Sequence, residues 1–262
     1  MSALDLLRSA AKEAGEIALA HRARGLKIWS KSGGSPVTDA DLAVDTFLKS
    51  RLMTARPDCG WLSEETADDP ARLGKRAIFV VDPIDGTVAF MKNKPWWTVA
   101  LALVQDGEPV AAVVHAPTLE ETYAAEAGGG AMRNGRPIRA SDANDLTDAS
   151  MLADAALLDR PIWAEPWPRL RLEKRNSIAY RMALVAAGAF DAALALTPKW
   201  DWDVCAGALI ATEAGAKTTD HRGRAYRFNQ PRAQQASLVC AAPALHPLIL
   251  RQCAPISAPD QD

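Results

Sequence analysis

Acidic residues that could hold a metal ion follow apolar segments at three places in the chain. They are Glu64 and Glu65 after GWLS, Asp82 and Asp85 after AIFVV, and Asp203 after KWDW. Carboxylates repel one another at close range unless a cation neutralises them, and sites built only from oxygen ligands suit Mg²⁺. The four histidines are scattered and the four cysteines form no CxxC pair, so no zinc site or disulfide framework competes. The pattern therefore predicts a magnesium site.

The segment DPIDGT, from Asp82 to Thr87, combines several features of such a site. Pro83 fixes one backbone torsion, so the two aspartates can face one side and leave the Ile84 carbonyl free to coordinate. Gly86 allows close approach of the backbone to a ligand. A helix that begins at Thr87 would offer free N–H groups to a phosphate. A plain turn could use the same residues, but the other acidic segments favour a metal site.

Two acidic segments leave alternatives open. Thr38 to Asp41 is also a capping box, so Asp41 either ties down a helix start or takes part in the site. The sequence WDWD offers both Asp201 and Asp203, and the spacing to AGALIATEAG favours Asp203 as the ligand. Asp201 then caps the helix or contacts the substrate.

The elements that position these residues differ between the two halves of the chain. In the first half, helical spacing of apolar residues predicts helices over 4–18 and 43–52. Strands are predicted at 77–82, on both sides of a DGEP turn within 97–117, and through 121–138 with an NG turn. This pattern predicts helices packed on a mostly antiparallel sheet, up to about residue 140.

The second half alternates strands and helices. Strands are predicted within 148–154, 191–197 and 236–243, and helices within 177–190 and 203–216. We therefore expect an α+β half at 1–140 with the metal motifs, an α/β half at 141–254, and a frayed tail at 255–262.

Composition excludes several classes of protein. The chain has 262 residues, of which 48% are hydrophobic and 24% charged, with a net charge of −2. This balance gives no electrostatic reason for nucleic acid or an acidic membrane as the main partner. The first 25 residues alternate charged and apolar residues, unlike a signal peptide, and no run of 18 apolar residues occurs. We therefore expect a cytoplasmic protein.

Four ordered segments carry a resemblance to a known family: VTDAD, SEE, DPIDGT and WDVCAGALIATEAG. Together they resemble the inositol monophosphatase family of Mg²⁺-dependent, lithium-sensitive phosphatases. The resemblance implies a layered αβαβα sandwich, hydrolysis of a small phosphomonoester without a covalent nucleophile, and a homodimer. The alternative from a different class is a non-catalytic, metal-binding regulator.

The resemblance also implies roles for individual residues. Glu64, Asp82 and the Ile84 carbonyl would hold one Mg²⁺, and Asp82, Asp85 and Asp203 a second. Thr87 would orient the attacking water, with Asp41 supporting it and assisting a third, weaker ion. Glu65 would support the neighbouring ligand as part of the catalytic set. Asp85, Gly86, Thr87 and Asp203 would also contact the substrate.

The substrate is the most open question. Inositol-specific members carry a glutamate seven residues before the WD aspartate, where this chain has Leu196, which cannot accept hydrogen bonds from a polyol. Arg181 lies where the CysQ-like bisphosphate nucleotidases carry a lysine, and a cation there could neutralise a second phosphate. The first hypothesis is a 3'(2'),5'-bisphosphate nucleotidase that converts 3'-phosphoadenosine 5'-phosphate to AMP. The alternative is a phosphatase of inositol phosphate or another small phosphorylated alcohol, which the segment AMRNGRPIRAS favours. The basic segment from Arg169 to Arg175 is either a solvated face or a contact for an anionic substrate.

Overall fold

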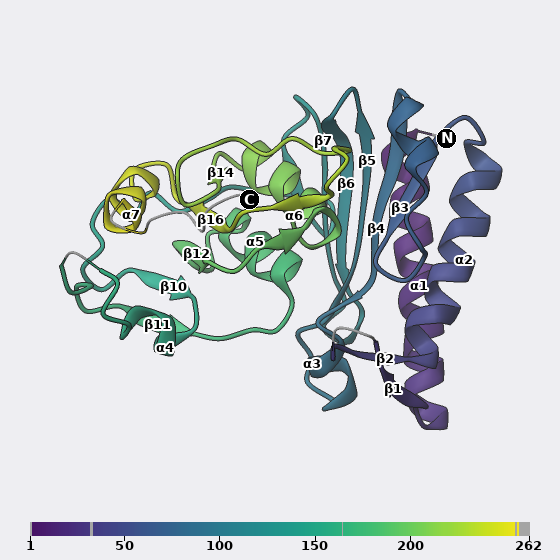
Figure 1. Cartoon of the computed structure of the whole chain (residues 1–262), viewed down its shortest axis with the longest axis horizontal. Helices are drawn as coiled ribbons and strands as arrows, with labels where there is room; N and C mark the ends of the chain where they lie inside the picture. Colours follow the sequence, from purple (N-terminus) through teal and green to yellow (C-terminus); the bar gives the residue numbers. More distant parts are fainter. Residues whose placement is uncertain (1, 32–33, 164, 255, 257–262) are drawn as a thin grey trace.

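Helices and sheets alternate in five layers along the longest axis of the molecule (Figure 1). The computed structural model describes residues 2–31, 34–163, 165–254 and 256. The outer layer is formed by α1 (Ala3–Arg24) and α2 (Asp39–Ala55), and the middle helical layer by α5 (Ile178–Ala186) and α6 (Asp201–Glu213). A seven-stranded sheet lies between these layers, and a five-stranded sheet separates α5 and α6 from α7 (His246–Cys253). The predicted αβαβα sandwich is confirmed.

The strands of the larger sheet lie in chain order. Its strands are β3 (Gly60–Ser63), β4 (Ala77–Asp85), β5 (Thr98–Gln105), β6 (Glu108–Ala116), β7 (Glu121–Glu126), β8 (Ala131–Arg133) and β9 (Arg136–Ile138). β3 pairs with β4 in parallel, and each later neighbouring pair is antiparallel. The predicted DGEP and NG turns join β5 to β6 and β8 to β9, with positive φ at Asp106, Gly107, Asn134 and Gly135.

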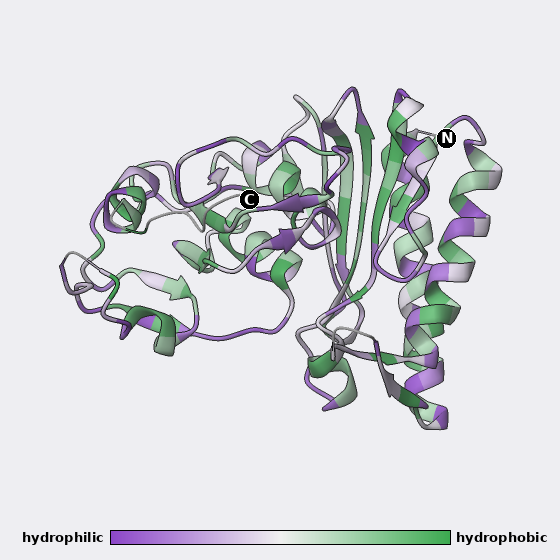
Figure 2. Cartoon of the chain, viewed as in Figure 1, coloured by the Kyte–Doolittle hydropathy of each residue, from purple (hydrophilic) through white to green (hydrophobic). Residues whose placement is uncertain are grey.

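Both faces of the sheet are largely buried over β3 to β7, and its long strands are mostly coloured hydrophobic in Figure 2. On one face, side chains such as Val81 and Leu101 pack against Leu7 and Leu48 of the outer helices. The opposite face belongs to a second core, which includes Met182 and Ile210 of α5 and α6 and also Leu238 and Cys240 of the smaller sheet. One core thus joins residues of both predicted halves, and the division near residue 140 stays a prediction.

The smaller sheet has mixed strand directions. Its order is β11 (Arg171–Glu173), β10 (Ser150–Leu152), β12 (Ala192–Ala195), β16 (Leu238–Ala241) and β14 (Lys217–Thr219). β10 runs parallel to β11 and β12, whereas β16 runs antiparallel to β12 and β14. Its outer face packs against α7 through Leu194, Val239 and Ile249.

Several short elements were not predicted, because a few residues carry too little periodicity to show in the sequence. They include the hairpin of β1 (Ile28–Ser30) and β2 (Pro36–Thr38), the pair β13 (Lys199–Trp200) and β15 (Gln234–Gln235), α4 (Ala155–Leu158), β11, β14 and α7. Helix α6 begins at Asp201, two residues earlier than predicted. The predicted tail lies outside the described residues apart from Ile256. None of the helices in the described residues has the length and apolar character needed to cross a bilayer.

Candidate active site

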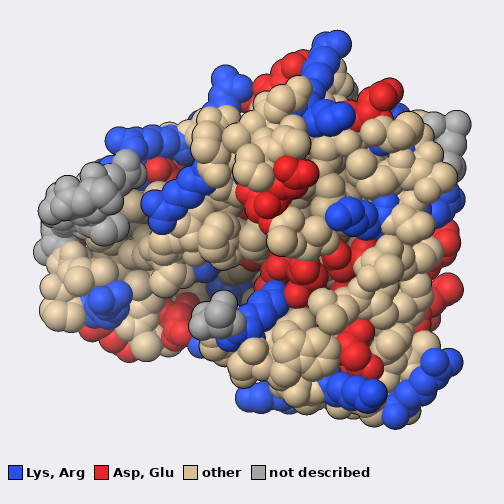
Figure 3. Space-filling view, turned by 45° about the vertical axis from the view of Figure 1, so that its right-hand side comes forward, with Lys and Arg blue, Asp and Glu red and all other residues tan. Residues whose placement is uncertain are grey.

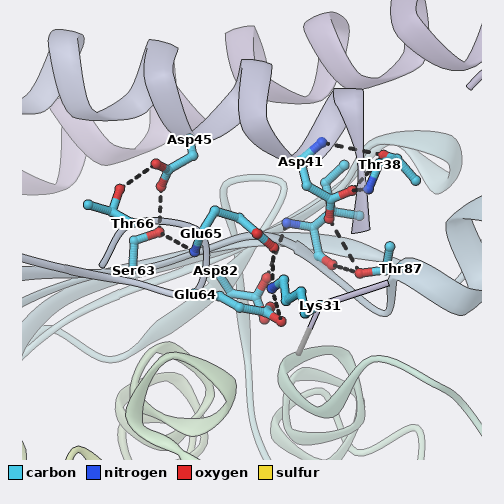
Figure 4. Close-up of polar contacts among 11 residues, drawn as sticks. Lys31, Thr38, Asp41, Asp45, Ser63, Glu64, Glu65, Thr66, Asp82 and Thr87 are labelled. Atoms are coloured by element: carbon cyan, nitrogen blue, oxygen red, sulfur yellow. Dashed lines mark hydrogen bonds and ion pairs between the residues drawn. The ribbon is translucent and has the colours of Figure 1, made fainter. Parts of the chain in front are cut away.

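The predicted acidic residues come from the ends of two strands and the start of one helix. Asp82 and Asp85 lie at the end of β4, and Glu64 directly follows β3. Because β3 and β4 are parallel, these ends meet at one edge of the sheet, where the Glu64 N–H donates to the Val81 carbonyl at 3.3 Å. Asp203 lies in the first turn of α6. Figure 4 shows Glu64, Glu65 and Asp82 near one another, and Asp85 and Asp203 lie near enough for their charges to act on Asp82.

Burial and mutual repulsion raise the pKa values of these carboxyl groups. Burial, together with the charges of Glu64, Asp85 and Asp203, raises the pKa of Asp82 well above its ordinary value. Burial and the neighbouring Asp85 and Glu64 raise the pKa of Asp203 to about 8. Such shifts mark negative charges that lack counter-charges, so the cluster favours the binding of a cation.

Asp85 has a second role at the start of α5. Its Oδ2 accepts hydrogen bonds from Ser177 Oγ and the Ala179 N–H, both at 2.6 Å, and its Oδ1 accepts one from the Ile178 N–H at 3.1 Å. Burial still raises the pKa of Asp85 to about 6, against these hydrogen bonds. The side chain therefore links the larger sheet to the middle helices.

The helix predicted to begin at Thr87 is present as α3 (Thr87–Met91). Gly86 precedes it with a φ of 92°, a conformation that side chains with a Cβ rarely adopt. A Cβ on Gly86 would lie 3.1 Å from the Ser177 nitrogen. Glycine is therefore required here because the start of α5 packs directly against the turn.

The capping-box interpretation of Asp41 is confirmed, and its part in the site stays a prediction. Its Oδ2 accepts a hydrogen bond from the Thr38 N–H at 2.9 Å and its N–H donates to Thr38 Oγ1 at 3.4 Å, which together form the capping box of α2. Thr38 Oγ1 also donates to the same Oδ2 at 2.5 Å. The Asp41 Oδ1 lies 3.4 Å from Thr87 Oγ1, which also lies 3.2 Å from the Ile84 carbonyl (Figure 4). Burial raises the pKa of Asp41 to about 6. The cap of α2 thus orients a carboxylate toward the predicted water-orienting hydroxyl.

Lys31, which the sequence analysis missed, pairs with both glutamates. Its Nζ lies 2.9 Å from Glu64 Oε1 and 2.7 Å from Glu65 Oε1 (Figure 4). Although burial acts to lower it, the pKa of Lys31 is raised overall by these two charges. Burial raises the pKa of Glu65 to about 7. Lys31 is a single lysine that belongs to no motif in the sequence. Only its ion pairs in the structure show that it lies at the site.

The donor set suits Mg²⁺ in its chemistry, but its side chains are held apart. Within residues 2–31, 34–163, 165–254 and 256, no three His, Cys, Asp or Glu side chains converge closely enough to hold a metal ion. Lys31 holds the glutamate pair, the start of α5 holds Asp85, and the Trp200 N–H donates to Asp203 Oδ2 at 2.8 Å. The groups are nevertheless hard oxygen donors with an excess of buried negative charge, which is what Mg²⁺ prefers.

A cavity of about 560 Å³ contains both residues that were singled out for the substrate. Arg181 and Leu196 line it, together with Lys199, Arg160 and Asp154. The Arg181 Nε donates to the Arg175 carbonyl at 2.7 Å. Ile178 also lines the cavity, and its N–H donates to Asp85 Oδ1, so the cavity borders the acidic cluster. Burial lowers the pKa of Lys199, while the charges of Asp203 and Asp85 oppose this shift. Figure 3 shows acidic and basic side chains meeting at a hollow in the surface.

Asp201 and the basic segment from Arg169 to Arg175 make contacts within the protein. Asp201 is buried at the start of α6, and its Oδ1 accepts a hydrogen bond of 2.8 Å from Gln235 Nε2. Arg169, in the basic segment, forms an exposed ion pair with Asp148, and no residue from 169 to 175 lines the cavity. This observation favours a solvated face for that segment.

The layered fold, with its acidic cluster beside a cationic cavity, is that of a phosphoric monoester hydrolase. The model described as "Inositol monophosphatase family" matches residues 2–257, and the chain belongs to this family of metal-dependent phosphatases, which generally use Mg²⁺. The resemblance seen in the sequence is thus confirmed, and the chain is an enzyme.

Relatives with different substrates are about equally similar to the chain. An inositol-1-monophosphatase of Rhizobium meliloti (strain 1021) is 32% identical over 229 residues, covering 82% of this chain and 81% of the relative. A histidinol-phosphatase of Chlorobaculum parvum is 33% identical, covering 84% and 86%. A 3'(2'),5'-bisphosphate nucleotidase CysQ of Aggregatibacter actinomycetemcomitans is 30% identical, covering 84% and 85%. The solved structure of a Thermotoga maritima IMPase has a TM-score of 0.84 at 27% identity, covering 97% of each chain. These comparisons establish the family but do not distinguish between the substrates. The residues that line the cavity must therefore be used to infer the substrate.

Proposed function

We propose that the chain is a Mg²⁺-dependent 3'(2'),5'-bisphosphate nucleotidase that hydrolyses 3'-phosphoadenosine 5'-phosphate to AMP and phosphate. The observation that carries this proposal is the cavity beside the acidic cluster, in which Arg181 and Lys199 accompany Leu196. Two cations suit a substrate with a second phosphate. Leu196 would leave the hydroxyl groups of a polyol without partners but can pack against the apolar parts of a nucleoside.

The proposed metal ligands are the carboxylates of Glu64, Asp82, Asp85 and Asp203 with the carbonyl of Ile84. We propose two ions and a third that binds more weakly. Bound Mg²⁺ supplies Lewis acidity to the phosphate and lowers the pKa of water. The raised pKa values of the carboxyl groups support this assignment, because a cation would relieve the repulsion that raises them.

The remaining residues orient the reactants. Thr87 Oγ1 lies between Asp41 Oδ1 and the Ile84 carbonyl, a position from which the hydroxyl can hold the attacking water. With a pKa of about 6, Asp41 is mostly ionised at neutral pH and can accept a proton passed through that hydroxyl. Glu65, paired with Lys31, supports the adjacent ligand Glu64.

The test is phosphate release with Mg²⁺, with and without lithium, from 3'-phosphoadenosine 5'-phosphate and inositol 1-phosphate side by side. We expect kcat/KM to favour the nucleotide by about 10-fold or more and Arg181→Ala to remove that preference, since a lost charge pair costs at least one factor of ten. A preference for inositol 1-phosphate would overturn the nucleotidase and favour the alternative, a phosphatase of a small phosphorylated alcohol.

A further inference from the structure

One carboxylate on the buried face of α2 holds both ends of the segment that carries the glutamate pair. Asp45 lies one helical turn after Asp41, and only 7% of it is exposed. Its Oδ1 accepts a hydrogen bond of 2.5 Å from Ser63 Oγ (Figure 4). Its Oδ2 accepts another of 2.5 Å from Thr66 Oγ1. The residues between these two hydroxyl groups are 64 and 65.

The anchoring continues into the backbone of the segment. Ser63 Oγ also accepts a hydrogen bond of 3.4 Å from the Glu65 N–H. On the other side, the Glu64 N–H donates to the Val81 carbonyl of β4. The backbone of the glutamate pair is therefore fixed between α2 and the larger sheet.

The side chain of Asp45 accepts hydrogen bonds only from Ser63 Oγ and Thr66 Oγ1 within the described residues, and neither residue is a proposed ligand. A buried carboxylate that accepts two charge-assisted hydrogen bonds is held in one orientation, so it can transmit that rigidity to the segment it binds. We propose that Asp45 is a positioning residue, which sets the location of Glu64 and Glu65 and thereby the affinity for Mg²⁺. This inference rests on the proposed function, in which Glu64 is a ligand.

The test measures binding of Mg²⁺ alone to the full chain by isothermal titration calorimetry. We expect Asp45→Ala to raise the Mg²⁺ dissociation constant about 10-fold or more, the usual effect of losing a group that orients a metal ligand. Saturating Mg²⁺ should restore most of kcat and leave KM for the phosphate substrate within about twofold, because the substrate contacts are intact. Asp45→Asn, which keeps the size and one acceptor, should have a smaller effect.

A matched control exists in the smaller sheet. Asp191 accepts hydrogen bonds of 2.6 Å from Ser141 Oγ and from Ser150 Oγ, so Asp191→Ala removes the same kind of pair away from the proposed ligands. It should lower the melting temperature and leave the Mg²⁺ dissociation constant unchanged. If Asp45→Ala behaves in the same way, Asp45 only stabilises the fold and the inference is wrong.

Two milder variants keep the test decisive if Asp45→Ala does not fold. Ser63→Ala and Thr66→Val each remove one hydroxyl group and leave the other bond in place. Each should weaken Mg²⁺ binding, and wild-type affinity in both would overturn the inference. A wild-type chain that binds no Mg²⁺ would overturn the proposed function and this inference with it, before any variant is compared.

Discussion

The Asp85 carboxylate lies 2.6 Å from the Ser177 hydroxyl, although 92 residues separate them in the chain. Ser177 Oγ also lies 3.1 Å from Thr98 Oγ1 on β5 and caps α5 through the Tyr180 N–H. The Asp85 side chain thus accepts hydrogen bonds at the start of α5 and also contributes negative charge to the candidate active site. Changes at this junction should affect stability and activity together, but to different extents.

Asp85→Asn should lower turnover by about 100-fold or more, because an amide replaces a charged ligand. The protein should remain folded. An amide nitrogen that faces the donors at the start of α5 lowers the free energy of unfolding by about 1–3 kcal/mol. The loss of a buried charge that repels its neighbours offsets part of this. Phosphate release and thermal melting by circular dichroism measure the two effects. Asp148→Asn, at an exposed ion pair, is the control. Unchanged turnover in Asp85→Asn would favour the non-catalytic regulator.

Gly86→Ala should lower the free energy of unfolding by about 1–3 kcal/mol and reduce activity. The cost arises from the positive φ and from the contact of the new Cβ with the Ser177 backbone. Gly215→Ala is the control, because Gly215, just after α6, also has a positive φ, of 87°, but no atom within 4 Å of the added Cβ. Urea unfolding of both variants separates the contact from the torsion. Equal losses would show that packing against α5 contributes nothing.

Leu196→Glu should change the substrate preference. The added carboxylate can accept hydrogen bonds from a polyol but repels a second phosphate, so kcat/KM for 3'-phosphoadenosine 5'-phosphate should fall about 10-fold and that for inositol 1-phosphate should rise. Leu196→Gln offers an acceptor without the charge and should show a weaker loss with the nucleotide. If neither substrate responds, Leu196 does not contact the substrate.

His115→Asn should make stability less dependent on pH in acid. Burial lowers the pKa of His115 to about 4, below the unfolded value of about 6.5, so the unfolded chain takes up a proton first as the pH falls. The contribution of neutral, buried His115 to the free energy of unfolding is fully present above pH 6.5. It is lost between pH 6.5 and 4, by up to about 3 kcal/mol. Asparagine can keep the hydrogen bond that Nδ1 makes to the Glu121 carbonyl. Urea unfolding from pH 7 to 4 should show a steeper decline for the wild type, and parallel curves would contradict this assignment.

The sequence by itself determined the elements whose signals are local. The apolar run before Asp82, the turn chemistry of Asp106 and Asn134, and the helical spacing after Asp203 predicted strands, turns and a helix that the structure contains. The acidic residues at the ends of these elements also predicted which carboxylates lie around the end of β4, and their role as metal ligands stays a prediction. Each of these signals lies within a few residues, and the physical forces behind them act along the chain.

Only the tertiary structure decided which residues surround those carboxylates. Lys31 and Asp45 belong to no motif, and the partners of each lie far along the chain. Lys31 pairs with Glu64 across 33 residues, and Asp45 accepts a hydrogen bond from Ser63 across 18. Packing of α2 against β4 and the position of Lys31 directly after β1 create these contacts. A single sequence records the residue types but not the distances between them, and electrostatic and hydrogen-bond energies depend on those distances.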